Sequence, residues 1–242
     1  MAPRLYTARG TYGDAYTVAC RLYTACLAHD VHLVHKVTAH DQYEPLIREI
    51  YSILPRLVLR VVGNKDTTPF PEIDSHPPGA DLPGGEQVEV PGVEMTWFPP
   101  FTFAKVEKFG LTPKGYISYV PIGGGIRAHG MLFRFAPDEE IKRVLTMGTV
   151  DCPVVVLGTE SHPLIQESDS VVNLVGQTSI LEAQQIIKNS CKFIGQQGLP
   201  LFTALSQRVS SVAYVMERHE KVVREARIIG EWKGYCSEIV VL

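Results

Sequence analysis

The chain has 242 residues, of which 45% are hydrophobic, and this suffices for a buried core in one large domain or two smaller ones. Its 23 Lys and Arg against 26 Asp and Glu give a net charge of −3, which excludes a global positive field that would attract nucleic acid or an anionic membrane. No apolar run approaches the ~20 residues of a membrane span, and the five cysteines form no C-x-x-C pair. We therefore expect a cytoplasmic protein with free thiols.

The first 65 residues alternate between strand and helix patterns and carry 8 Lys and Arg against 5 Asp and Glu. Apolar runs rich in β-branched residues predict strands, and segments with apolar residues at helical spacing predict helices. The expected strands are 4–8, 31–37 and 57–62, and the expected helices are 14–28 and 43–54.

Four histidines in this region, at positions 29, 32, 35 and 40, lack a carboxylate partner at the helical spacing of a metal site. We therefore expect solvated or acceptor-facing side chains for His29, His32, His35 and His40.

Residues 66–100 contain seven acidic residues, eight prolines and no Lys or Arg. Such a segment cannot form a regular helix, because proline lacks the amide donor and clashes with the preceding turn. We expect a long surface excursion with one short strand at Gln87–Val90.

Residues 116–242 repeat a strand–turn–helix pattern, which predicts βαβ units in a doubly wound α/β sheet. With the first region this gives two lobes, 1–115 and 116–242, whose ligands bind at the carboxyl ends of the strands. The expected strands are 116–122, 153–158, 171–176, 191–195 and 209–215, and the expected helices are 137–147, 179–190, 200–208 and an amphipathic one at 216–233.

The turn 10-GTYGDAY-16 places one carboxylate, Asp14, near the start of a helix. One interpretation is a helix cap, which stabilises by ~1 kcal/mol and has no other role. The other is a general base that deprotonates an acceptor hydroxyl at the wall of a cleft.

Other strand ends carry groups suited to a phosphate or a nucleoside. In 121-PIGGGIRAHG-130 the glycines allow backbone amides to approach a phosphate and Arg127 adds charge, although a flexible turn is an equal alternative. An acid after a buried strand suits ribose hydroxyls, and the glycine-rich turn 194–200 suits a second phosphate contact. Helix capping by Ser179 and Glu182, and an ordinary strand–helix connection at 194–200, are the structural alternatives.

These motifs together resemble glycosyltransferase family 9, the heptosyltransferase group. The similar segments are 10-GTYGDAY-16, 116-YISYVPIGGGIRAHG-130, 156-VLGTE-160, 176-GQTSILE-182 and 193-FIGQQGLP-200. The resemblance implies a GT-B-like α/β fold, with two Rossmann-like lobes, a cleft between them and a reduced first lobe. The family's aspartate and histidine in the last turn are replaced here by Gln197 and, approximately, Phe202.

The resemblance further implies a glycosyltransferase that moves a sugar from a nucleotide diphosphate sugar, a UDP-sugar first, to an acceptor hydroxyl. Asp14 would be the base, and neither a metal nor a further cofactor is expected. The expected donor-binding residues are Gly123, Gly124, Gly125, Arg127, Thr159, Glu160, Gln177, Thr178, Glu182, Gly195, Gln196, Gln197 and Gly198, and the expected acceptor-binding residues are Tyr12, Gly13 and Tyr16.

The acceptor stays open between a glycan, a metabolite and DNA. The basic first 65 residues keep open a DNA glycosyltransferase of the viral type, acting on a hydroxymethylated base, although the net negative charge of the chain argues against it. Two further alternatives are a non-catalytic nucleotide-sugar-binding or interaction module, and an epimerase-like Rossmann enzyme, against which the imperfect glycine pattern argues.

Overall fold

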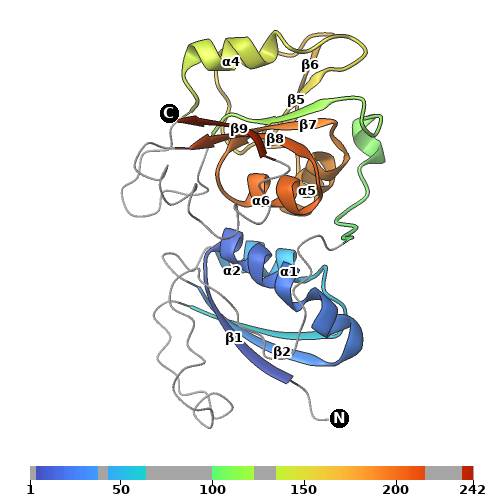
Figure 1. Ribbon diagram of the computed structural model, residues 1–242, viewed down its shortest axis with the longest axis vertical. Coiled ribbons are helices and arrows are strands. Elements are labelled where there is room, and N and C mark those ends of the chain that lie inside the picture. The colour runs from blue at the N-terminus through green and yellow to red at the C-terminus, as the bar shows by residue number, and fades with distance from the viewer. Residues whose placement is uncertain (1–3, 38–42, 64–99, 123–134, 216–235, 242) are drawn as a thin grey trace. The chain divides into compact units, whose positions relative to one another are not determined.

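The computed structural model describes residues 4–37, 43–63, 100–122, 135–215 and 236–241 (Figure 1). The chain divides into two compact units, Met1–Phe101 and Thr102–Leu242, so the second unit begins before the expected residue 116. Phe103 already belongs to it, because its amide donates to Gln185 Oε1 at 2.9 Å. Phe101 instead packs edge-to-face on Tyr23, with ring centroids 5.0 Å apart. No helix in the described parts of the chain is long and apolar enough to cross a membrane.

The first unit is a three-stranded parallel sheet in the order β1-β2-β3. The strands β2 and β3 have the predicted bounds, whereas α2 ends before the predicted residue 54. Pro55 explains the early end, because a proline in a helix lacks the amide donor and its ring would clash with the carbonyl four residues earlier, which is that of Tyr51. The elements are β1 (Arg4–Gly10), α1 (Tyr12–Ala28), β2 (Val31–Val37), α2 (Glu44–Tyr51) and β3 (Leu57–Val62).

Both helices lie on the same face of this sheet (Figure 1). This follows from the strand order, because each parallel connection is right-handed and the chain advances in one direction across the sheet. The buried residues of this unit include Leu22, Ile47 and Ile50 on the helices and Val31 and Leu33 on β2.

The second unit is a six-stranded parallel sheet in the order β6-β5-β4-β7-β8-β9. The chain starts at β4, moves outward to β6 and returns to β7, so the two central strands flank a reversal of direction. The elements are η2 (Glu107–Phe109), β4 (Ile117–Val120), α4 (Asp138–Leu145), β5 (Val154–Val156), β6 (Val171–Asn173), α5 (Ile180–Asn189), β7 (Lys192–Gln196), α6 (Leu199–Ser206), β8 (Ser210–Val215) and β9 (Cys236–Val241).

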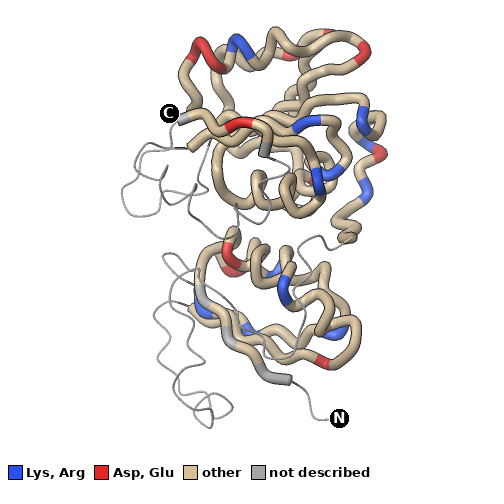
Figure 2. Tube along the Cα trace, viewed as in Figure 1, with Lys and Arg blue, Asp and Glu red and all other residues tan. Residues whose placement is uncertain are grey.

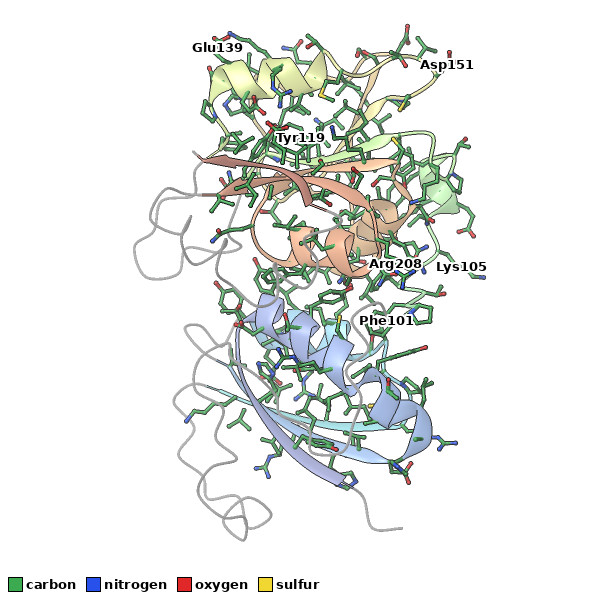
Figure 3. All side chains as sticks on the ribbon, viewed as in Figure 1. Phe101, Lys105, Tyr119, Glu139, Asp151 and Arg208 are labelled. Atoms are coloured by element: carbon green, nitrogen blue, oxygen red, sulfur yellow. The ribbon has the colours of Figure 1, made fainter. Side chains whose placement is uncertain are left out.

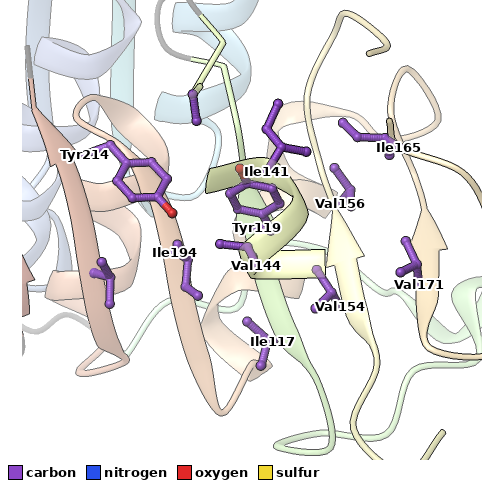
Figure 4. Packing of buried hydrophobic residues seen from close by; sticks show 12 residues of the cluster. Ile117, Tyr119, Ile141, Val144, Val154, Val156, Ile165, Val171, Ile194 and Tyr214 are labelled. Atoms are coloured by element: carbon purple, nitrogen blue, oxygen red, sulfur yellow. The ribbon is translucent and has the colours of Figure 1, made fainter. Parts of the chain in front are cut away.

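Helices cover both faces of this sheet, as the doubly wound prediction requires: α4 on one, α5 and α6 on the other (Figure 1). On the α4 side, Ile141 and Val144 pack on Tyr119, Ile194 and Val154 in one apolar cluster (Figure 4). The strands β4 and β5 are buried along their whole length, which is typical of parallel strands covered on both faces.

Three segments differ from the predicted secondary structure or lie outside the described residues. The edge strand β9, parallel to β8, was not predicted. The predicted helix 216–233 and the predicted strand Gln87–Val90 lie outside the described residues, as does nearly all of the segment 66–100.

Candidate functional site

The turn between β1 and α1 carries the predicted base, Asp14. Asp14 is not the N-cap of α1; Thr11 is, and Asp14 is the third helical residue. Its Oδ2 accepts hydrogen bonds from the Thr11 amide at 2.7 Å and from Thr11 Oγ1 at 3.0 Å. Among the described residues, no hydrogen bond to Asp14 Oδ1 and no ion pair of Asp14 is formed. Asp14 therefore caps the helix as the third residue of a capping box and not as its N-cap, and its Oδ1 has no hydrogen-bond partner among the described residues.

Gly10 makes this arrangement possible. It ends β1 with a φ of +144°, a backbone geometry that side chains with a Cβ rarely adopt. A Cβ at this position would collide with the Cβ, Cγ and Oδ2 atoms of Asp14. The glycine thus lets the chain turn and lets the Asp14 carboxylate fold back over the end of β1.

Behind the turn lies a buried polar pair that the sequence did not reveal. The side chain of His35, on β2, has no exposed surface, and its Nδ1 lies 2.8 Å from the Tyr51 hydroxyl while its Nε2 lies 3.2 Å from the Gly10 carbonyl oxygen. Burial lowers the pKa of His35, although the Gly10 carbonyl and the charge of Asp14 act in the opposite direction. Burial, together with the charge of Asp14, raises the pKa of Tyr51 well above its usual value.

The expectation of solvated histidines is therefore wrong for His35. His29 is the C-cap of α1, and its amide donates to Ala25 O at 2.8 Å, while His32 is half-buried and His40 lies outside the described residues. No group of three or more potential metal ligands occurs within the described ranges.

The three predicted acceptor-binding residues fall in the first two turns of α1. Tyr12 is half-buried and packs edge-to-face on Tyr43, and Gly13 O accepts a hydrogen bond from Thr17 Oγ1 at 3.3 Å. Tyr16 differs from its prediction, because its side chain is fully buried and its ring packs on Phe101. A buried ring in the core of the unit cannot contact an acceptor in this structure.

In the second unit, the reversal of chain direction lies between β4 and β7. Open parallel sheets bind ligands at the carboxyl ends of such strands, where neighbouring connections leave in opposite directions. Gln196, only 6% exposed at the end of β7, donates from Nε2 to the Pro121 carbonyl at 3.0 Å, just past the end of β4. This bond joins the two strand ends at the predicted ligand-binding edge.

The predicted phosphate turn 195–198 is shorter than expected. Gly195 and Gln196 belong to β7, and Gly195 pairs with Val120 on one side and Ala213 on the other. The Gln197 amide also donates to Tyr214 O at 3.0 Å, so it is not free for a phosphate. Of the four residues, Gly198 alone caps a helix, and its φ of +130° requires glycine.

Apart from Glu182, the other predicted donor residues divide into three groups. Thr159 and Glu160 are exposed just past β5, in the expected place. Gln177 is also exposed, but its Nε2 donates to Asn173 O at 2.7 Å, and Thr178 beside it is half-buried. The predicted phosphate-binding residues Gly123, Gly124, Gly125 and Arg127 lie outside the described residues.

Glu182 has a structural role. It forms the predicted capping box with Ser179: Ser179 N donates to Glu182 Oε2 at 2.8 Å, and Glu182 N donates to Ser179 Oγ at 3.2 Å. Its carboxylate also pairs with Lys108 at 2.9 Å, which holds the pKa of Glu182 below its usual value. Both contacts occupy the group that was expected to reach a donor nucleoside.

A second polar cluster, only partly buried, lies between the sheet and α4. The Tyr214 hydroxyl donates to Glu140, which also binds Arg143 at 2.7 Å, and the hydrogen bond from Arg143 is the main cause that lowers the pKa of Glu140. Tyr119, labelled in Figure 3, is fully buried and lies beside Tyr214 (Figure 4), and burial raises the pKa of Tyr119. Along α4 the acids precede the bases (Figure 2), as the helix dipole favours.

Comparison with solved structures identifies the fold. A glycosyl transferase of family 9 from Veillonella parvula DSM 2008 aligns with a TM-score of 0.58 and 12% sequence identity, over 99% of this chain and 85% of that chain. The iron-containing dodecameric glycosyltransferase TibC from enterotoxigenic E. coli H10407 gives a TM-score of 0.45 and 11% identity, over 88% of this chain and 58% of that chain, a similarity too low to carry an argument.

No family model and no curated protein matches the sequence. The similarity to the structure from Veillonella parvula shows that the two proteins share an α/β fold, and the predicted resemblance to family 9 is confirmed at the level of the fold.

Proposed function

We propose that the protein transfers a sugar from a nucleotide diphosphate sugar to an acceptor hydroxyl. The observation that carries this proposal is the fold, which follows a glycosyl transferase of family 9 over nearly the whole chain. The further proposal is that the two units act as the two lobes of a GT-B enzyme, the first on the acceptor side and the second on the donor side.

In the proposed reaction, Asp14 accepts the proton of the acceptor hydroxyl while the oxygen of that hydroxyl attacks the anomeric carbon of the sugar. The nucleoside diphosphate leaves with the electron pair of the broken carbon–oxygen bond. The geometry of Asp14 supports this role, because Thr11 holds Oδ2 from two donors and so fixes the direction of Oδ1. A positioned general base contributes typically 10²–10⁴-fold to a rate.

The departing diphosphate needs positive charge or amide donors, which we assign to Arg127 and to the first turn of α6 after Gly198. The side chain of Gln196 binds the Pro121 carbonyl and would keep that turn at a fixed distance from the end of β4. Thr159 and Glu160, exposed at the end of β5, suit the ribose hydroxyls of the donor.

A second candidate is a module that binds a nucleotide sugar without turnover. It is favoured by the hydrogen bonds of Asp14 to Thr11, since a capping role alone explains them. The two candidates make the same prediction for donor binding and opposite predictions for turnover.

A thermal-shift screen with UDP-, GDP-, ADP- and CMP-sugars, with NAD and NADP as controls, tests donor binding. A ligand at ~100 times its Kd stabilises the folded state by about 2.7 kcal/mol, a readily visible shift. We expect Arg127→Ala to abolish the shift, while Arg48→Ala, which removes an exposed arginine paired with Glu44 on α2, preserves it. The proposal would be refuted if NAD alone shifted the melting temperature, or if none of the nucleotides did.

Turnover is then measured as nucleoside diphosphate release with a panel of glycans, metabolites and DNA that contains hydroxymethylated bases. DNA belongs in the panel because the first 65 residues carry an excess of Lys and Arg. Binding without release for any acceptor would favour the non-catalytic candidate.

A further inference from the structure

The Gly10 carbonyl, at the end of β1, is hydrogen-bonded from the neighbouring strand. Its oxygen lies 3.2 Å from Nε2 of His35, a residue 25 positions later in the chain. The other ring nitrogen, Nδ1, lies 2.8 Å from the hydroxyl of Tyr51, at the end of α2. One buried ring thus joins β1, β2 and α2 at the point where the chain turns toward Asp14.

The chemistry of the partners fixes the proton positions on the ring. A backbone carbonyl can only accept, so Nε2 of His35 carries the proton and donates to Gly10 O. In the neutral ring Nδ1 is then the acceptor, and the Tyr51 hydroxyl donates to it. Burial favours this neutral form and lowers the pKa of His35.

The carbonyl that His35 binds belongs to Gly10, and the turn depends on the backbone geometry of this residue. Gly10 has a φ of +144° and lies directly before Thr11, whose amide and hydroxyl both bind Asp14 Oδ2. A rotation of the peptide between Gly10 and Thr11 would break the contact with His35 and redirect the Thr11 amide together, because one peptide plane contains both groups.

We propose that His35 and Tyr51 are positioning residues that fix the Gly10–Thr11 peptide and, through it, the direction of the Asp14 carboxylate. This inference rests on the proposed function, since Asp14 is positioned there for proton abstraction. The pair acts through the backbone and does not contact the substrate. Loss of the pair lowers turnover rather than binding, because a misplacement of about 1 Å at a reacting group can cost on the order of 10²-fold in rate.

Three variants test the pair, with one control. His35→Leu removes both hydrogen bonds, His35→Gln restores a donor toward Gly10 O, and Tyr51→Phe removes only the hydroxyl that selects the tautomer. Val31→Ala is the control, because Val31 is also fully buried and lies four residues earlier on β2, on the same face and roughly 13 Å away. Thermal unfolding of each variant shows how much stability it loses.

We expect His35→Leu to lower kcat at least tenfold with the donor KM within about twofold, and His35→Gln to recover most of that loss. The kcat of Tyr51→Phe should lie between those of His35→Leu and His35→Gln, and this variant keeps the test valid if His35→Leu does not fold. Val31→Ala should lose stability without a comparable loss of kcat. Equal kcat values for His35→Leu and Val31→Ala at similar loss of stability would overturn the proposal.

Hydrogen exchange of the Thr11 amide tests the same inference without any activity. This amide is bound to Asp14 Oδ2, so its exchange should accelerate at least tenfold in His35→Leu and remain unchanged in Val31→Ala. If no donor or acceptor supports turnover, the proposed function fails and the exchange rate alone decides the role of His35. Unchanged exchange in His35→Leu would refute that role even in an active enzyme.

Discussion

Replacing Asp14 with asparagine separates its role in the fold from its proposed role in the reaction. The carboxylate caps α1 through two bonds from Thr11, at 2.7 and 3.0 Å, and its charge lies in the first turn, where the helix dipole favours an anion. Loss of a cap costs about 1 kcal/mol and loss of the dipole interaction up to about 1 kcal/mol more. Asp14→Asn retains an oxygen that can accept from Thr11, so we expect about 1 kcal/mol in total.

That loss lowers Tm by roughly 4–8 °C for a unit of this size but leaves the protein folded at 25 °C, because domains have about 5–15 kcal/mol of stability. The rate should fall much further, by 10²–10⁴-fold, if Asp14 is the general base. Thr11→Ala is the comparison: it removes the 3.0 Å bond, keeps the 2.7 Å bond from the amide, and retains the carboxylate.

The assay is the initial rate of nucleoside diphosphate release at saturating donor and acceptor, with Tm measured on the same samples. We expect Asp14→Asn and Thr11→Ala to lose similar stability and very different fractions of kcat. If Asp14→Asn retains more than half of the wild-type kcat while Tm falls, the carboxylate is a cap only.

Four further outcomes follow from the structure. As pH falls from about 6.5, His35 takes up a proton in the unfolded chain before it does in the folded protein, because its pKa is lowered in the folded state. Urea titrations should therefore show that wild type loses more stability on acidification than His35→Gln does. Gly195→Ala should cost about 1–3 kcal/mol in the same titration, because a Cβ there would lie 2.8 Å from the Val120 carbonyl oxygen. EDTA should leave nucleoside diphosphate release unchanged if the chain itself neutralises the diphosphate. A disulfide oxidant such as oxidised glutathione should join Cys152 and Cys191, whose sulfurs lie 3.9 Å apart, as a peptide map by mass spectrometry would show.

The elements that the sequence predicts well are those with local signals. The strands β2 and β3 follow from short β-branched runs between turn residues, and the capping box of α5 follows from the spacing of Ser179 and Glu182. The turn at Gly10 also follows from local sequence, since a glycine before a helix start indicates a special backbone geometry.

The errors concern contacts between residues far apart in the chain. His35 looked like one of several polar histidines, and only its contacts with Gly10 and Tyr51, 25 and 16 residues away, make it a buried structural group. The predicted strand ends at residue 195 and Gln196 is expected in the glycine-rich turn after it, yet the pairing of Gln196 with Tyr214 on β8 extends β7 by one residue. No local pattern contains either fact.

Asp14 and Glu182 occur in the same local motif but differ in their contacts with residues far away in the chain. Asp14 and Glu182 both lie three residues after the N-cap of a helix that follows a parallel strand, and both bind the amide of that N-cap. Glu182 has in addition an ion pair with Lys108, 74 residues earlier, so its carboxylate is bound on both sides.

Asp14 forms no ion pair within the described parts of the chain, and its turn is instead fixed by a hydrogen bond from the neutral ring of His35 to the Gly10 carbonyl. A carboxylate that is fixed through the backbone, and whose second oxygen has no partner among the described residues, is suited to accept a proton. A carboxylate that is bound to a lysine is suited to join two elements. The same sequence motif can therefore predict a helix start in both places, and only the tertiary contacts make Asp14 the better candidate for chemistry.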